Sequence, residues 1–143
     1  MPVDKLFGQT INLLAKNLDL RAKRHEYIAG NIANVETPNY TPRSLSFEKE
    51  LQGTIKKNER GGDASSATTH PRHIPLKGVA GKVEEVRGTI EEKSSASISG
   101  DGNGVEVEHE MGKMAENQIL FNASVQILAK KFEGLKYAVK GGN

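Results

Sequence analysis

Cysteine and tryptophan are absent from the sequence, and aromatic residues make up only 5% of it. Without cysteine there is no disulfide, no thiolate metal ligand and no thiol nucleophile. Burial of aromatic and aliphatic side chains supplies most of the free energy that holds a core together. With 36% apolar residues and a mean hydropathy of −0.54, an elongated or partly folded chain is therefore more expected than a compact enzyme.

A strong excess of positive charge is also missing, since the formal net charge is +2 and is spread evenly. This excludes the basic footprint of a nucleic-acid-binding protein. The one local cluster, Arg21 to His25, is a solvated helix face or, as the alternative, a contact with an acidic partner. No apolar run is long enough to cross a bilayer, and the first residues lack the pattern of a secretory signal. If the protein leaves the cytoplasm, we expect a route without a cleaved signal peptide.

The chain divides into residues 1–40, 41–104 and 105–143, and the first part predicts a helix over 4–34. Asp4 is a plausible N-cap, and Pro38 and Pro42 prevent the helix from continuing. Polar Arg21 and His25 interrupt its apolar seam. The N-terminal assembly seam consists of Phe7, Ile11, Leu14, Leu18, Ile28 and Ile32, broadened by Leu6, Leu13, Leu20 and Tyr27.

The last part carries an unbroken alternation of four- and three-residue spacings, which is typical of a long helix that packs on another helix. Gln118 is the only polar residue in this pattern. Asn103 and Glu106 suggest a capping box, and Gly141 supplies the stop. The C-terminal assembly seam consists of Val107, Met111, Met114, Phe121, Val125, Leu128, Phe132, Leu135 and Val139.

The middle part is irregular and glycine- and serine-rich, so we expect it to be partly disordered in isolation. Phe47, Leu51 and Ile55 predict one face of a short helix, and the segment 74–90 has enough Val and Ile for a β-hairpin. The predicted fold class is mainly all-α, with long terminal helices pairing as a coiled-coil-like hairpin. Spacing alone leaves open whether each seam closes within one chain or between chains.

No constellation of residues supports catalysis. His70 and His73 are three apart, but Pro71 disfavours a helix and no carboxylate stands at ligand spacing. The Gly-rich segment 100–104 lacks the ligands of a calcium loop and the lysine of a phosphate loop. No nucleophile stands with a base, so we predict no enzyme, no metal, no cofactor and no small-molecule substrate. A metal-dependent enzyme that uses both histidines is the alternative.

The segment 31–40 resembles a signature of bacterial flagellar rod and hook proteins, in which a helix ends in Ala-Asn and is followed by Thr-Pro-Gly-Tyr. Asn39 stands where that pattern often has glycine, a mild departure because asparagine tolerates the left-handed conformation. Segments 47–51, 71–74, 101–103 and 114–118 resemble further blocks of the FlgB family of basal-body rod proteins, with the sister FlgC family as the alternative. The signature residues are Asn31, Ala33, Asn34, Thr37, Pro38 and Tyr40.

The resemblance implies a structural subunit of the flagellar rod, the hollow drive shaft that crosses the periplasm and transmits torque. Such subunits are exported by the flagellar type III apparatus and self-associate through their terminal helices. Other rod subunits, the rod adaptor FliE and the MS ring are the implied partners. A soluble helical adaptor or chaperone shares the amphipathic ends, but it gives no reason for the signature.

Overall fold

The computed structural model describes residues 4–60, 82–92 and 105–141. Two long helices dominate it: α1 covers Asp4–Ala33 and α3 covers Val107–Val139. The shorter elements are strand β1 (Arg43–Ser46), helix α2 (Glu48–Arg60), the 3-10 helix η1 (Val83–Glu85) and strand β2 (Thr89–Glu92). The mainly α-helical fold with long terminal helices, predicted from the sequence, is confirmed.

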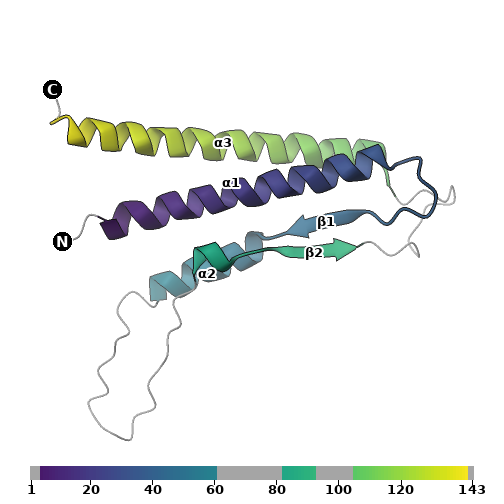
Figure 1. Ribbon diagram of the computed structural model, residues 1–143, viewed down its shortest axis with the longest axis horizontal. Helices are drawn as coiled ribbons and strands as arrows, with labels where there is room; N and C mark the ends of the chain where they lie inside the picture. The colour runs from purple at the N-terminus through teal and green to yellow at the C-terminus, as the bar shows by residue number, and fades with distance from the viewer. Residues whose placement is uncertain (1–3, 61–81, 93–104, 142–143) are drawn as a thin grey trace, which may run out of the picture.

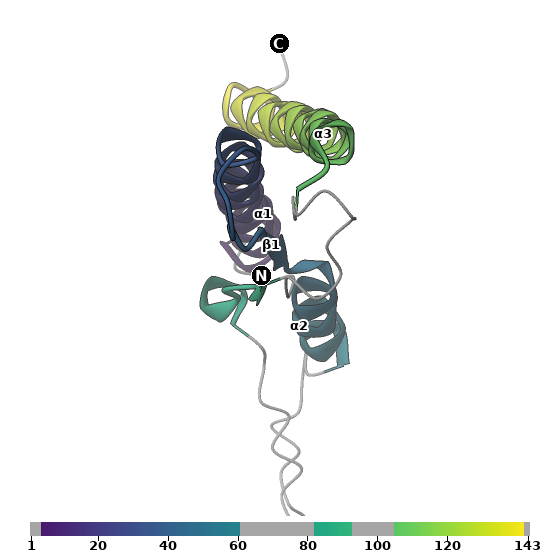
Figure 2. The ribbon, with the colours of Figure 1, turned by 90° about the vertical axis from the view of Figure 1, so that its right-hand side faces the viewer.

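Helix α1 lies in the middle of the molecule. Figures 1 and 2 show α3 running along one side of α1, antiparallel to it, while β1, β2, α2 and η1 lie on another side. The start of α1 and the end of α3 therefore lie at the same end of the structure (Figure 1). At about 1.5 Å per residue, the 33 residues of α3 span about 50 Å.

A small apolar core joins α1 to the short elements. Phe47 and Leu20 are 1% exposed and lie at its centre. Leu13 and Tyr27, seven residues to either side of Leu20, pack against the same cluster, which explains why the apolar surface of α1 extends beyond one seam. The other buried members are Leu45, Leu51, Val83 and Val86.

The two strands form an antiparallel pair in which Leu45 lies opposite Ile90 and Arg43 opposite Glu92. The hairpin predicted over 74–90 falls largely outside the described residues, and β2 pairs with β1 rather than with a neighbouring segment. Gly88 precedes β2 with φ of +74°, and a Cβ there would lie 2.9 Å from Leu45 Cδ1. Both its backbone conformation and its close packing therefore require glycine.

The sequence predicts the C-terminal end of α3 correctly but not its N-terminal cap. The predicted capping box is wrong, because the helix begins at Val107 and Glu106 occupies the N-cap without a side-chain bond. Asn103 lies outside the described residues. The predicted stop is confirmed: Gly141 has φ of +79°, and its N–H donates to the carbonyl of Ala138.

Candidate functional site: the paired terminal helices

The side chain of Asn31 links three segments of the chain. Its Nδ2 donates to the carbonyl of Arg43 at 2.8 Å and to Glu110 Oε2 at 3.0 Å. Its Oδ1 accepts from the N–H of Arg43 at 3.0 Å and from the Tyr40 hydroxyl at 3.2 Å. An asparagine amide has two donor hydrogens and two acceptor lone pairs, and all four are used here. Asn31 is 2% exposed, so these bonds are made away from water.

The turn that follows α1 brings Tyr40 and Arg43 back to Asn31. Asn34 closes the helix, because its Nδ2 donates to the carbonyl of Gly30 at 2.8 Å. Thr37 N–H then donates to Asn34 O, and Tyr40 N–H to Thr37 O. Asn39 has φ of 59°, which confirms the left-handed conformation expected where the related signature has glycine. The signature thus forms a tight turn that brings the chain back alongside α1, where Asn31 bonds to Tyr40 and Arg43.

Three residues of α3 that are seven apart make polar contacts with α1. Glu110 accepts from Asn31, Asn117 Nδ2 donates to the carbonyl of Arg21 at 2.9 Å, and the Ser124 hydroxyl donates to Asn17 Oδ1 at 3.1 Å. We call Glu110, Asn117 and Ser124 the polar ladder. Glu110 and Asn117 are 5% and 3% exposed. Since a shifted helix would leave these buried groups unpaired, the ladder specifies the alignment of α1 against α3.

The basic cluster of α1 has structural partners. The guanidinium of Arg24 lies 4.4 Å from the centre of the Phe47 ring, donates to the carbonyl of Leu45 and forms a two-pronged ion pair with Glu48. The guanidinium of Arg21 lies 5.6 Å from the centre of the same ring, and burial lowers its pKa. Burial opposes ionisation of Glu48, but the bonds from Arg24 outweigh it and hold its pKa below the ordinary value.

The carboxylate of Glu110 is held ionised in the same way. Burial alone would raise its pKa, but hydrogen bonds from Lys113, at 2.6 Å, and Asn31 outweigh that effect and lower the pKa. A depressed folded-state pKa stabilises the fold above the unfolded pKa and loses that contribution as pH falls through the folded value. The Asn31–Glu110 contact therefore weakens in acid.

We expect Glu110→Gln to flatten the loss of stability below about pH 4.5. Glutamine keeps an acceptor for Asn31 but does not titrate, so the stability of the variant should fall less steeply than that of the wild type. At pH 7 it should be about 1 kcal/mol less stable, because a charge-assisted bond becomes neutral. Urea unfolding between pH 3 and 7 measures both effects. Parallel pH profiles would contradict the assignment, and Glu108→Gln, on the exposed face, serves as control.

The C-terminal seam residues separate into two sets. The inward set, Val107, Met114, Phe121, Leu128 and Leu135, is half-buried at every position. The outward set, Met111, Val125, Phe132 and Val139, is 59%, 42%, 52% and 85% exposed. Gln118, the polar residue of the pattern, belongs with the outward set and is also exposed.

The described side chains of the N-terminal seam are either buried or half-buried. Ile28 is 4% exposed, whereas Ile11, Leu14, Leu18 and Ile32 are half-buried. Phe7 is part of α1, but its side chain lies outside the described residues. Of the signature residues, Asn31 is buried, Asn34 and Tyr40 are half-buried, and Ala33, Thr37 and Pro38 are exposed.

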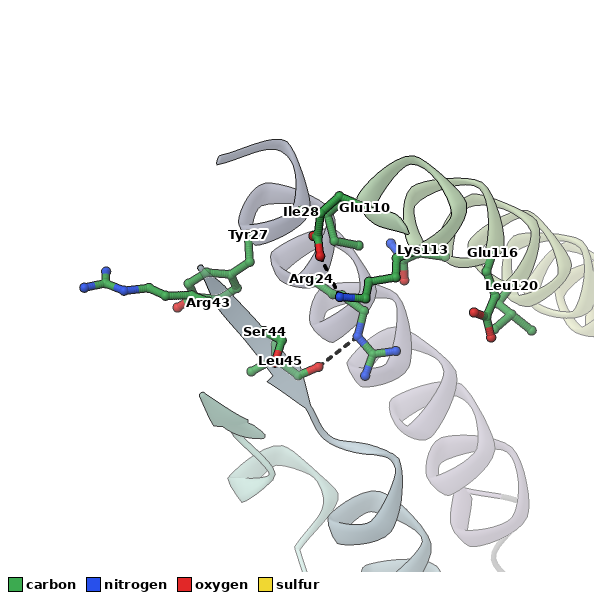
Figure 3. A pocket seen from close by; sticks show the side chains of 11 residues that line it. Arg24, Tyr27, Ile28, Arg43, Ser44, Leu45, Glu110, Lys113, Glu116 and Leu120 are labelled. Atoms are coloured by element: carbon green, nitrogen blue, oxygen red, sulfur yellow. Dashed lines mark hydrogen bonds and ion pairs between the residues drawn. The ribbon is translucent and has the colours of Figure 1, made fainter. Parts of the chain in front are cut away.

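A pocket of about 190 Å³ opens between α1, β1 and α3, beside the polar ladder (Figure 3). Tyr27, Ile28, Leu45 and Leu120 supply its apolar lining. Its cations are already engaged: Arg24 with Glu48, Arg43 with Glu92 and Lys113 with Glu110. The lining residues hold no nucleophile–base pair, so the pocket provides an apolar surface for packing rather than a catalytic centre.

Sequence reasoning missed Glu110, Asn117 and Ser124, because a search for apolar spacing treats polar residues as surface. A signal was present: Glu110, Asn117 and Ser124 are seven apart, and polar Arg21 interrupts the opposite seam. In the described segments, no group of three or more potential metal ligands comes together. His70 and His73 lie outside those segments. Neither long helix, where described, has an apolar stretch sufficient to span a bilayer.

Comparison with known proteins gives relatives along almost the whole chain. The flagellar basal body rod protein FlgB of Escherichia coli (strain K12) is 33% identical over 145 residues, covering 99% of each chain. The protein of the same name from Cereibacter sphaeroides (strain ATCC 17029) is 33% identical over 135 residues, covering 94% of this chain and 97% of the relative. That of Salmonella typhimurium is 30% identical over 127 residues, 88% and 89% of the two chains. No family model matches the chain.

Proposed function

The chain belongs to the FlgB family of flagellar basal body rod proteins, and from this membership we propose that it is a structural subunit of the rod. In this proposal it polymerises through its terminal helices into the hollow shaft that crosses the periplasm and transmits torque. Its neighbours are other rod subunits, the adaptor FliE and the MS ring. It reaches them through the flagellar type III export apparatus, without a cleaved signal peptide.

The outward set of α3 carries this proposal. Its four side chains repeat along about 40 Å of helix and lack a covering element in the part of the chain that the structure describes. Polar Gln118 is the single interruption of this row, and soluble monomers rarely leave so long a row of apolar side chains uncovered. Burying a valine or phenylalanine side chain yields about 1.5–3 kcal/mol, so a neighbouring subunit that covers the row gains substantial binding free energy.

The polar ladder, on the side of α3 that contacts α1, also supports the proposal. Because it holds α1 and α3 in one alignment, it presents the outward set as a rigid row. A binding surface on ordered elements loses less conformational entropy on association than a flexible one. A soluble adaptor would use the same row, but it would not require copies of the chain to associate in a rod.

Complementation tests the proposed function. In a flagellated bacterium that lacks its own FlgB, expression of this chain is expected to restore swimming and rods in purified basal bodies. In vitro, mixing the purified chain with the other rod subunits should give rod-like particles and a gain in helical circular dichroism. A chain that restores neither motility nor rods, while accumulating normally, would refute the proposal.

A further inference from the structure

The last turns of α3 are exposed on almost every side. From residue 129 to residue 141, Leu135 is half-buried and every other residue is exposed. Val139 and Phe132 are 85% and 52% exposed. Figure 1 shows that these turns, together with the start of α1, extend beyond α2 and η1. This end of the helix pair therefore leaves apolar side chains in contact with solvent.

Phe132, Leu135 and Val139 form an apolar stripe along these turns. At 100° per residue, the three side chains span about 60° of the helix circumference. Lys131 stands about 40° beyond Leu135 on one border, and Lys136 stands about 40° beyond Phe132 on the other. We call these five residues the basic-edged stripe. A lysine can lay its methylene groups along such a stripe while its ammonium group stays in a polar environment.

Positive charge dominates this end of the helix pair. Residues 129–140 of α3 carry four lysines and one acid, Glu133, which gives a net charge of +3. The first residues of α1 run alongside, and their two charges, on Asp4 and Lys5, cancel. None of the four lysines forms an ion pair with a described residue. The four are Lys130, Lys131, Lys136 and Lys140.

The helix dipole accounts for only part of this charge. It favours cations within the last turn of a helix, where Lys136 lies. Lys130 and Lys131 lie about two turns before the end of α3, so the dipole gives no reason for them. At the opposite end of the helix pair, residues 22–33 and 107–118 together carry three basic and four acidic residues. An anionic surface would therefore attract the C-terminal end of α3 and not its other end.

We infer that the free chain binds the surface of an anionic lipid bilayer through the basic-edged stripe. Phe132 and Val139 enter the boundary between headgroups and acyl chains, and the lysines lie among the lipid phosphates. The contact is peripheral, since no described helix is long and apolar enough to span a bilayer. Phe132 and Val139 also belong to the outward set, so a neighbouring subunit and a lipid surface compete for them. The inference concerns the chain before assembly and goes beyond the proposed function.

The shape of this end favours a lipid surface over an acidic protein. A specific protein interface needs complementary shape, and charged residues are depleted at its centre. The basic-edged stripe is three apolar side chains wide and has a lysine within one turn on each border. The pocket lined by Leu120 lies more than three turns away from Phe132. A bilayer accepts a short apolar row bordered by cations without a matching shape.

Co-sedimentation of the purified full-length chain with vesicles tests the inference. The chain should bind vesicles of phosphatidylglycerol and phosphatidylcholine at least about tenfold more tightly than phosphatidylcholine vesicles, and added salt should weaken the binding. Each lysine near an anionic surface is worth about fivefold in affinity, so Lys131→Gln/Lys136→Gln should lose at least about tenfold. Lys49→Gln/Lys56→Gln removes the same charge from exposed positions of α2 and should bind like the wild type.

Val139→Gln tests whether the apolar side chains enter the bilayer. Its position is exposed, so thermal unfolding should be unchanged, while binding to the anionic vesicles should fall about tenfold. Three results would overturn the inference: equal binding to the two kinds of vesicle, equal losses in the two lysine variants, or a Val139→Gln chain that binds like the wild type. A chain that binds immobilised polyglutamate but not vesicles would also overturn it. Swimming of the complemented strain tests the proposed function separately.

Discussion

Replacing Asn31 with aspartate is expected to lower the free energy of unfolding by about 3–5 kcal/mol. The substitution keeps the shape of the side chain but removes both donors, so Arg43 O loses its partner and a second carboxylate faces Glu110. Since small domains have a total stability of about 5–15 kcal/mol, much of the variant population would be unfolded under mild denaturant. Urea unfolding followed by circular dichroism at pH 7 measures the change.

Asn122→Asp is the matched control for this variant. Asn122 is exposed on α3 and only accepts a hydrogen bond, from Gln118, which an aspartate can also accept. The control introduces the same charge and should change stability by less than about 0.5 kcal/mol. Equal effects of the two substitutions would contradict the view that the four bonds of Asn31 hold the signature turn, β1 and α3 together.

The second large effect is expected from aspartate substitutions at two positions of α3 that are three residues apart. One should block assembly alone, and the other should also destabilise the fold. Val125 belongs to the outward set, so Val125→Asp should leave stability within about 0.5 kcal/mol of the wild type and yet abolish swimming. Leu128 belongs to the inward set and is half-buried, so Leu128→Asp should cost about 2–4 kcal/mol of stability and also abolish swimming.

Thermal unfolding of the purified chains and swimming of the complemented strain measure the two properties separately. Two findings would count against the division of the seam: a Val125→Asp chain that unfolds as easily as Leu128→Asp, or one that swims normally. Val125→Thr, which keeps a β-branched side chain of similar size without adding charge, should retain most of the motility.

The sequence predicts the two long helices because their apolar spacing extends over many turns, and local spacing determines where a helix forms. It also predicts the left-handed Asn39 and the end of α3 at Gly141, because both depend on the backbone preferences of single residues. The β1–β2 pair is harder to predict, since its strands are distant in the sequence and only tertiary packing brings Leu45 opposite Ile90.

The division of the C-terminal seam could not be predicted from apolar spacing. Phe121 and Phe132 both satisfy the pattern, yet Phe121 packs toward α1 whereas Phe132 is half exposed. The difference comes from Glu110 and Asn117, whose hydrogen bonds to α1 turn their side of the helix inward. These partners lie 79 and 96 residues away in the chain, so no local pattern reveals them.

The central claim is that α3 uses one set of seam residues within the chain and the other set between subunits. Because the chain has no cysteine, single cysteines placed at Phe121, Val125, Leu128 and Phe132 report the environment of each position without background. In the purified monomer, cysteines at 125 and 132 should react with a maleimide much faster than those at 121 and 128. In basal bodies isolated from the complemented strain, all four should be protected. Cysteines at 125 and 132 that remain as reactive in basal bodies as in the monomer would contradict the account.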